Sequence, residues 1–266
     1  MDLGLRDRAC ILTGGSRGIG LEVARQLHAE GAGLLLLGRD EQALAAAAED
    51  VDASDTAAVK WLALDVTDAD AGERAAGACL EHFGRLDALV NNAGTSSVCA
   101  IDELTDEDWQ AQWKINVLAP MHLMRAAVPQ MVKGGWGRVV NVCSSSGKRP
   151  GQRNVAYSVT KAAELSLSRA YADAYAQHGV LVNAVTPGPV ASELWLEPGG
   201  LADQTVQARG GTRQAVLEAA AAGLPIRRLA GAEEIAAVIV FLCSERASNV
   251  AGAAWSVDGG AVPVII

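Results

Sequence analysis

The segment "ACILTGGSRGIG", residues 9–20, carries the pattern that decides the fold. A short apolar run at 9–12 predicts a buried strand, and a glycine-rich turn follows it directly. Gly14, Gly18 and Gly20 permit a tight turn, close approach of the backbone to a phosphate, and a helix that starts packed against a sheet. The spacing differs from the usual G-x-G-x-x-G pattern, so the position of this turn between a strand and a helix is what makes it informative.

Further short apolar runs alternate with longer helical patterns along the chain. They lie at residues 33–37, 61–64, 87–90, 138–143, 180–185 and 253–257. Strand candidates separated by helices predict an α/β fold with one doubly wound parallel sheet of about seven strands and helices on both faces. Since no linker interrupts the pattern, we expect a single domain over residues 1–266. Ligands of such sheets bind beyond the carboxyl ends of the strands, so the residues after each run are the candidate site.

The composition excludes several kinds of function. The net charge of -9 and the pI near 5.0 leave no basic surface for nucleic acid or for membrane phosphates. The first residues show neither a signal peptide nor a membrane anchor. The 5 widely spaced cysteines suit reduced thiols, and the 4 histidines lack the spacing of metal ligands. We therefore expect a cytoplasmic protein with no metal.

The residues after the second run, Gly38, Arg39 and Asp40, bear on the choice of cofactor. A dinucleotide fold that uses NAD places an acid here on the ribose hydroxyls, whereas an arginine suits the 2′-phosphate of NADP. Arg39, together with Arg17 of the glycine turn, therefore favours NADP(H), and Asp40 is expected to cap the helix that follows. The alternative is NAD(H), with Asp40 on the ribose.

Polar residues also follow the third and fourth runs. Asp65 and Val66 come after the third run, where an aspartate can accept a hydrogen bond from an adenine amino group. The sequence "NNAG", residues 91–94, comes after the fourth and offers its backbone to a cofactor. Both are also ordinary turn sequences, so their shared place at strand ends is what gives them weight.

A long helical pattern at residues 154–179 holds Tyr157 and Lys161 on one face, and Gly179 is placed to end the helix. Such a pair occurs on many ordinary helices. Ser144, which follows the fifth run, stands thirteen residues before Tyr157.

These motifs together resemble the short-chain dehydrogenase/reductase family over nearly the whole chain, in the family's order. They are Thr13-Gly14-x-x-x-Gly18-Ile19-Gly20, Asn91-Asn92-Ala93-Gly94, Asn116, Ser144, Tyr157-x-x-x-Lys161 and Pro187-Gly188. The resemblance implies a Rossmann-type domain that transfers a hydride between a nicotinamide cofactor and a carbonyl or secondary alcohol substrate. It also implies a homo-oligomer, either a tetramer or a dimer.

The resemblance assigns catalysis to four residues. Tyr157 is the general acid/base, and Lys161 stabilises its phenolate and holds the nicotinamide ribose. Ser144 hydrogen-bonds the substrate oxygen, and Asn116 links the lysine to solvent through water.

The cofactor contacts implied by the resemblance lie at the strand ends and in the loop after the sixth run, where Val190 and Ser192 would meet the carboxamide. They are Gly14, Ser16, Arg17, Gly18, Ile19, Gly20, Arg39, Asp65, Val66, Asn92, Ala93, Gly94, Tyr157, Lys161, Pro187, Gly188, Val190 and Ser192.

The segment at about 192–228 is expected to bind the substrate as a lid, and the identity of that substrate stays open. Leu194, Trp195, Leu196 and Leu201 suit an apolar pocket, a lid packed on the body, or a subunit contact equally well. The candidate substrates are ketones, alcohols, polyols, steroids and 3-oxoacyl thioesters. An acidic acyl carrier protein is disfavoured as a partner by the net charge of -9. A cofactor-binding module without catalysis is the less favoured alternative, because all four catalytic residues are present.

Overall fold

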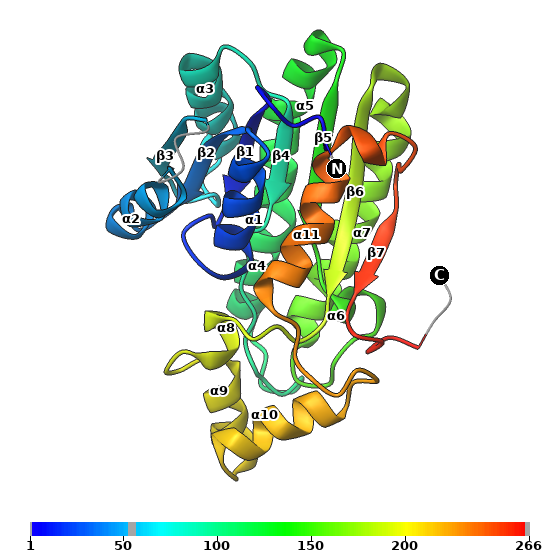
Figure 1. Ribbon diagram of the computed structural model, residues 1–266. Coiled ribbons are helices and arrows are strands. Elements are labelled where there is room, and N and C mark those ends of the chain that lie inside the picture. Colours follow the sequence, from blue (N-terminus) through cyan, green and yellow to red (C-terminus); the bar gives the residue numbers. More distant parts are fainter. Residues whose placement is uncertain (1, 53–56, 264–266) are drawn as a thin grey trace.

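A computed structural model describes residues 2–52 and 57–263 (Figure 1). Within these ranges the chain forms a 7-stranded, wholly parallel sheet in the order β3-β2-β1-β4-β5-β6-β7. The strands are β1 Ala9–Thr13, β2 Gly33–Gly38, β3 Val59–Ala63, β4 Ala88–Asn91, β5 Gly137–Val142, β6 Val180–Pro187 and β7 Ala254–Val257. The predicted doubly wound sheet is confirmed, with β3 starting two residues before the apolar run that predicted it.

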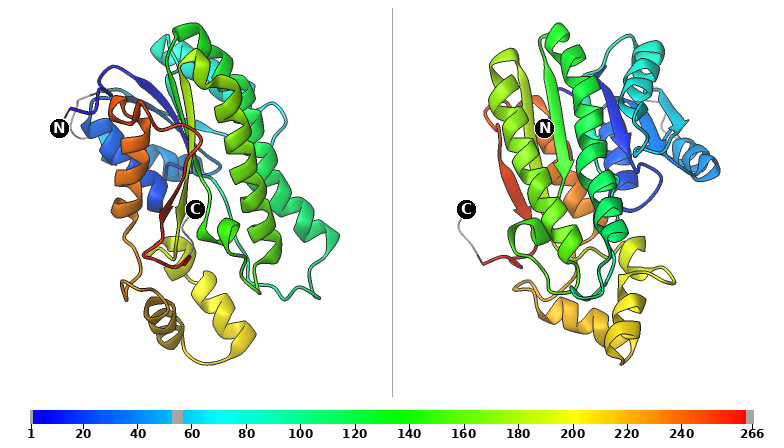
Figure 2. Two further views of the ribbon diagram at one scale, coloured as in Figure 1. Left: turned by 90° about the vertical axis from the view of Figure 1, so that its right-hand side faces the viewer. Right: turned by 180° about the vertical axis from the view of Figure 1, so that it is seen from behind.

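Helices cover both faces of the sheet (Figure 2). One face carries α1 Gly18–Ala29, α2 Glu41–Asp52 and α11 Ala232–Cys243, and the other carries α3 Ala71–Phe83, α5 Ala119–Gly134 and α7 Val155–Tyr175. Alternate side chains of each strand enter opposite cores: Leu34 and Leu36 of β2 pack in one, and Leu35 and Leu37 pack in the other. This two-sided burial explains the almost unbroken leucine run of β2.

The remaining elements lie mostly beyond the carboxyl ends of the strands. They are α4 Asp106–Trp113, η1 Lys114–Leu118, α6 Ser145–Lys148, η2 Ala176–His178, α8 Glu193–Leu196, α9 Leu201–Arg209, α10 Arg213–Ala222 and η3 Glu245–Ala247. In Figure 1, α8, α9 and α10 project below the ends of the strands as a separate small layer.

The strand order reverses between β1 and β4, which lie side by side at the centre of the sheet. The chain leaves β1 toward one face through α1, and after β4 it continues to α5 on the other face. Divergence of this kind opens a crevice at the carboxyl ends of the two strands, where open parallel sheets bind ligands.

Two further features of the described residues concern membrane-spanning helices and cysteines. None of their helices is long and apolar enough to cross a membrane. All five cysteines are free thiols, and Cys10, Cys79, Cys143 and Cys243 are buried.

Candidate active site

The glycine turn between β1 and α1 has a shape that only glycine permits. Gly14 and Gly18 have φ angles of 65° and 53°, in the left-handed region. A Cβ atom on Gly20 would lie 2.0 Å from the carbonyl oxygen of Gly14, so the turn is folded onto the start of the helix. The glycines of the turn place no side chain of their own in front of the first amide groups of α1, which suits an anionic group, although the Glu193 carboxylate lies next to Gly18.

Asn92 and Thr13 hold this turn in place. Asn92 Nδ2 donates to the carbonyl oxygens of Thr13 at 3.0 Å and Gly14 at 3.2 Å. The amides of Asn92 and Ala93 both donate to Thr13 Oγ1 at 2.9 Å. Because these two amides are already bonded, the backbone groups of "NNAG" that remain for a cofactor are its carbonyls and Gly94. The bracing role of the Asn92 side chain was missed, and its only signal in the sequence is an asparagine at a strand end.

Ser144, Tyr157 and Lys161 meet at the carboxyl end of β5. Ser144 follows that strand and caps α6, while Tyr157 and Lys161 lie in the first turns of α7. Lys161 Nζ lies 5.8 Å from the centre of the Tyr157 ring and donates to the carbonyl of Val142 at 2.9 Å. The four-residue spacing thus places an ammonium beside a phenol against the end of the sheet.

The charges around Tyr157 act in opposite directions. Burial raises the pKa of the phenol, whereas the Lys161 ammonium and a hydrogen bond from Ser144 lower it. Burial alone would lower the pKa of Lys161, but the Glu164 carboxylate and the phenol outweigh burial, so the net shift is upward. The phenol therefore stays protonated at neutral pH beside a lysine that stays charged.

Asn116 lies in a π-helical turn, η1, between α4 and α5. Its Nδ2 donates to Gln112 Oε1 at 2.9 Å and Thr160 Oγ1 at 3.1 Å. Its buried Oδ1 has no partner among the described residues. A Cβ atom on Gly94 would lie 3.1 Å from Oδ1 and 3.6 Å from Lys161 Nζ, so Asn116, Gly94 and Lys161 share one small space. An orphaned buried acceptor here suits a bound water or ligand.

The two arginines expected at the cofactor phosphate differ in their surroundings. Arg39 is exposed and makes no hydrogen bond or ion pair to another described residue, but its charge contributes to lowering the pKa of Asp65. The larger causes of that shift are the hydrogen bonds from the amide and hydroxyl of Thr67. Arg17 instead donates to Glu197 at 3.0 Å.

Asp40 takes the capping role that the sequence assigned to it. Its Oδ1 accepts a hydrogen bond from the amide of Ala43 at 3.0 Å, in the first turn of α2. This bond occupies an oxygen that the NAD(H) alternative would place on a ribose.

The other cofactor candidates also lie near the carboxyl edge, with different degrees of burial. Val66 and Val190 are 6% and 4% exposed and pack in the two cores, so only their backbone is open to a ligand. Ser16, Ile19, Gly188 and Ser192 are half-buried, and Pro187 ends β6.

Side-chain contacts join the segment at 192–228 to the carboxyl edge of the sheet. Arg17 of the glycine turn pairs with Glu197, and Gln204 Oε1 accepts from the amide of Val98 at 3.0 Å. Leu201 packs inward at 9% exposed, whereas Leu194 and Leu196 are 45% and 38% exposed. The leucines therefore divide between packing and outward-facing positions.

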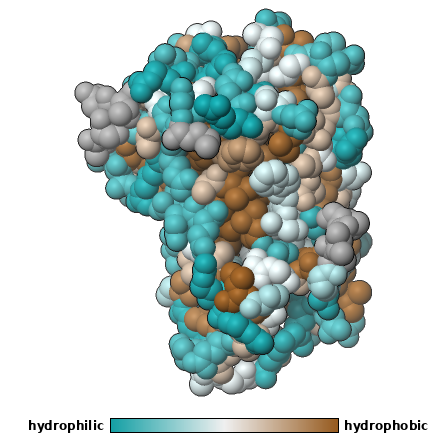
Figure 3. All heavy atoms as spheres, turned by 45° about the vertical axis from the view of Figure 1, so that its right-hand side comes forward, coloured by the Kyte–Doolittle hydropathy of each residue, from teal (hydrophilic) through white to brown (hydrophobic). Residues whose placement is uncertain are grey.

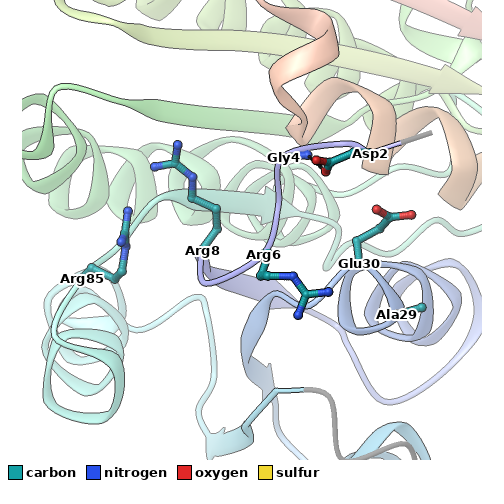
Figure 4. Close-up of a pocket in the computed structure, with 7 residues that line it drawn as sticks. All are labelled: Asp2, Gly4, Arg6, Arg8, Ala29, Glu30 and Arg85. Atoms are coloured by element: carbon teal, nitrogen blue, oxygen red, sulfur yellow. Dashed lines mark hydrogen bonds between the residues drawn. The ribbon is translucent and has the colours of Figure 1, made fainter.

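A polar pocket at the opposite edge, near the amino ends of the strands, does not belong to this site. Arg6, Arg8, Glu30 and Arg85 line it together with the first residues described (Figure 4). Arg8 and Arg85 are both paired with the buried Asp87. The described residues also hold no cluster of His, Cys, Asp and Glu arranged to bind a metal ion.

Comparison with known proteins gives the family. The model of the short chain dehydrogenase family matches residues 8–198. The chain therefore belongs to the short-chain dehydrogenase/reductase family. It is an oxidoreductase that acts on alcohol or ketone substrates, in a family that uses a nicotinamide cofactor.

Several relatives resemble the chain over almost their full length. D-beta-hydroxybutyrate dehydrogenase of Cupriavidus necator is 34% identical over 96% of this chain and 98% of its own. Galactitol 2-dehydrogenase of Agrobacterium fabrum is 33% identical with the same coverage. The crystal structure of L-sorbose reductase from Gluconobacter frateurii, complexed with NADPH and L-sorbose, is 34% identical, covers 100% of both chains and superposes with a TM-score of 0.93.

Proposed function

We propose that this protein is an NADP(H)-dependent carbonyl reductase, also able to oxidise the corresponding secondary alcohol, with Tyr157 as general acid/base. The observation that carries the proposal is the meeting of Ser144, Tyr157 and Lys161 at the carboxyl end of β5, while the glycine turn follows β1, two strands away. Asn116 completes the group through the space it shares with Lys161.

The crevice suits a dinucleotide. The turn from Gly14 to Gly20 lets a phosphate approach its amide groups once the Glu193 carboxylate beside Gly18 moves away, and the exposed Arg39 is unpaired among the described residues at the end of β2. Its chemistry matches a 2′-phosphate. The NADPH in the similar L-sorbose reductase structure supports the same choice, and NAD(H) is the alternative.

When bound, the nicotinamide supplies the hydride that is added to the carbonyl carbon. The chain's own residues then handle the proton. Ser144 holds the carbonyl oxygen, and Tyr157 donates its phenolic proton to that oxygen as the negative charge develops. Lys161 stabilises the resulting phenolate, and a water on the free Oδ1 of Asn116 offers the route by which a solvent proton restores the phenol.

The proposed substrate is a small ketone or secondary alcohol bound under the lid at 192–228. Three named relatives act on L-sorbose, galactitol or sorbitol, which favours a polyhydroxylated substrate. A short 3-hydroxy acid is the second candidate, because of the D-beta-hydroxybutyrate dehydrogenase match. The net charge of -9 disfavours docking of an acidic carrier protein.

The experiment that tests this function compares Tyr157→Phe with Tyr171→Phe. Both substitutions remove one hydroxyl from α7, but Tyr171 is partly buried and packs against the core further along the helix. Reduced-nicotinamide absorbance is followed with NADPH and NADH across ketoses, polyols, 3-hydroxy acids and simple ketones. We expect Tyr157→Phe to lose at least about a hundredfold in kcat while keeping its affinity for NADP(H), because the proton donor is gone. Wild-type turnover by Tyr157→Phe would refute the acid/base role.

We also propose that the protein works as a homo-oligomer in a reducing compartment such as the cytoplasm. Trp255 of β7 is 38% exposed and stacks on Phe241 of α11, and apolar atoms gather along the middle of the face drawn in Figure 3. The free cysteines suit a reducing compartment. Sedimentation analysis would distinguish a tetramer or dimer from a monomer.

A further inference from the structure

Glu164 is a buried carboxylate that the reaction described above does not use. It lies on α7 one turn beyond Lys161, and it is 1% exposed while Lys161 is 3% exposed. Removing two charges from water is costly, and only close pairing and further hydrogen bonds offset that cost. A glutamate kept at such a position must make contacts that offset this cost.

The contacts of Glu164 join α7 to the end of β5. Its Oε2 accepts a hydrogen bond from Lys161 Nζ at 2.7 Å, and its carboxylate also accepts from the thiol of Cys143, the residue before Ser144. Lys161 Nζ donates a second hydrogen bond to the carbonyl of Val142. An ammonium has three hydrogens, so these two acceptors fix its position and leave one hydrogen for the crevice.

We propose that Glu164 is a positioning residue that anchors the Lys161 ammonium beside Tyr157 and thereby sets how readily the phenol releases its proton. The proposal rests on the proposed function of Tyr157. It adds a fifth residue to the four that the family resemblance implies, and it concerns a contact that those four do not include.

Electrostatics gives the direction of the effect. The negative charge of Glu164 disfavours a phenolate nearby and raises the pKa of Tyr157, against the lowering by Lys161. It also raises the pKa of Lys161 and so keeps the ammonium charged inside the protein. Among the described residues, Cys143 is the one other titratable group among the main causes of the pKa shifts of Glu164, Lys161 and Tyr157, and burial raises the pKa of its thiol, which keeps it neutral. No group of α4, α5, α6, β6 or η1, which pack against α7, is among those causes.

The pair of charges therefore does two things. Glu164 keeps the lysine in place and charged. Its negative charge also offsets part of the lowering of the Tyr157 pKa by that lysine. Tyr157 remains a protonated donor through neutral pH, which suits the reduction of a carbonyl better than the oxidation of an alcohol.

The test is Glu164→Gln, which keeps a hydrogen-bond acceptor and removes the negative charge. We expect the pKa of Tyr157 to fall, because the glutamine amide oxygen still holds the Lys161 ammonium while the opposing negative charge is gone. Alcohol oxidation needs the phenolate, so the increase of the oxidation rate with pH should begin at a lower pH than in the parent protein. Carbonyl reduction needs the phenol, so the pH at which the reduction rate declines should move down by the same amount. We expect kcat to carry these shifts and KM to change little.

Direct titration gives a readout that needs no substrate. The chain has 3 tyrosines, and the phenolate absorbance of the full-length protein minus that of Tyr157→Phe isolates Tyr157. The control is Asp173→Asn, which removes one negative charge from an exposed position on the same helix. This control should leave the titration where it is in the parent protein.

Each outcome bears on one hypothesis. A downward shift in Glu164→Gln that is absent in Asp173→Asn supports the inference, even if no substrate in the panel is turned over. An unshifted titration in a folded Glu164→Gln protein overturns it, while Tyr157→Phe decides the proposed function separately. If Glu164→Gln does not fold, Glu164→Asp provides the decision: its carboxylate is one methylene shorter and withdraws from Lys161 Nζ, so the titration of Tyr157 should be displaced from that of the parent, and an unchanged titration would contradict the inference.

Discussion

At the scale of single residues, side-chain chemistry in the sequence indicates which atoms can react, and burial decides their strength. Tyr157 and Lys161 are recognisable by their spacing on one helical face. Glu164, three residues after the lysine, has the spacing of an ordinary surface ion pair. Only the packing of α7 against β5 shows that this pair is buried, and therefore that its charges act strongly on the phenol.

Arg39 is the residue on which the proposed preference for NADP(H) depends. We expect Arg39→Asp to weaken NADPH binding roughly tenfold to a hundredfold, because a charge-assisted hydrogen bond is lost and a repulsive charge is added. NADH has no 2′-phosphate, so its affinity should change much less. The ratio of the two dissociation constants, measured by fluorescence titration, checks this expectation.

The control for that substitution is Arg74→Asp. Arg74 lies in the first turns of α3, its side chain is 45% exposed, and its substitution by aspartate changes the charge by the same amount at a residue to which no cofactor contact is assigned. An NADPH/NADH ratio that is equal in Arg39→Asp, Arg74→Asp and the parent protein would contradict the phosphate assignment.

At the scale of elements, the junction of β1 and α1 shows how a turn can be specified by the absence of side chains. We expect Gly20→Ala to destabilise the protein by about 1–3 kcal/mol and to weaken NADP(H) binding strongly, because the new methyl group would collide with the Gly14 carbonyl 2.0 Å away. Urea unfolding and cofactor titration measure the two effects.

Gly77→Ala provides the matched comparison. Gly77 lies inside α3, and a Cβ there would meet nothing within 4 Å. Alanine should stabilise this helix by roughly 0.5–1 kcal/mol, since it loses less backbone entropy than glycine. If both substitutions have the same effect, close packing at the glycine turn is not what limits the site.

The π-helical turn η1 is the element that the sequence does not reveal. The residues "KINVL" have the apolar pattern of any helix, and nothing in them marks the change of hydrogen bonding. The π turn arises between α4 and α5, where Gln112 and Thr160 bond Asn116 and leave its Oδ1 free beside Gly94.

At the scale of the whole molecule, the segment at 192–228 places two carboxylates beside the glycine turn. Glu197 pairs with Arg17, and a Cβ on Gly18 would lie 2.9 Å from Glu193 Oε2. Both acidic groups therefore lie where the phosphates of a bound dinucleotide are expected. Cofactor binding should displace them, which would couple the position of this segment to occupancy of the crevice.

We expect Glu197→Gln to lower the dissociation constant of NADPH roughly two- to fivefold, the scale of one exposed ion pair, because Arg17 is freed and a competing charge is removed. Limited proteolysis of the segment in the absence of cofactor should become faster. Glu218→Gln, in α10 of the same segment, is the control, since within the described ranges Glu218 bonds only Gln214. Unchanged or weaker NADPH binding in Glu197→Gln would show that the pair does not compete with the cofactor.

The sequence by itself determined the order of strands and helices, the glycine turn, the residues at each strand end and the family that these motifs resemble. It did so because apolar periodicity and glycine positions act locally, within a few residues along the chain. The tertiary structure alone decided the burial of Glu164 against Lys161, the bracing of the turn by Asn92, the free oxygen of Asn116 and the contact of Glu197 with Arg17. Each depends on the distance and dielectric between groups brought together by packing, and neither quantity is written in the spacing of residues.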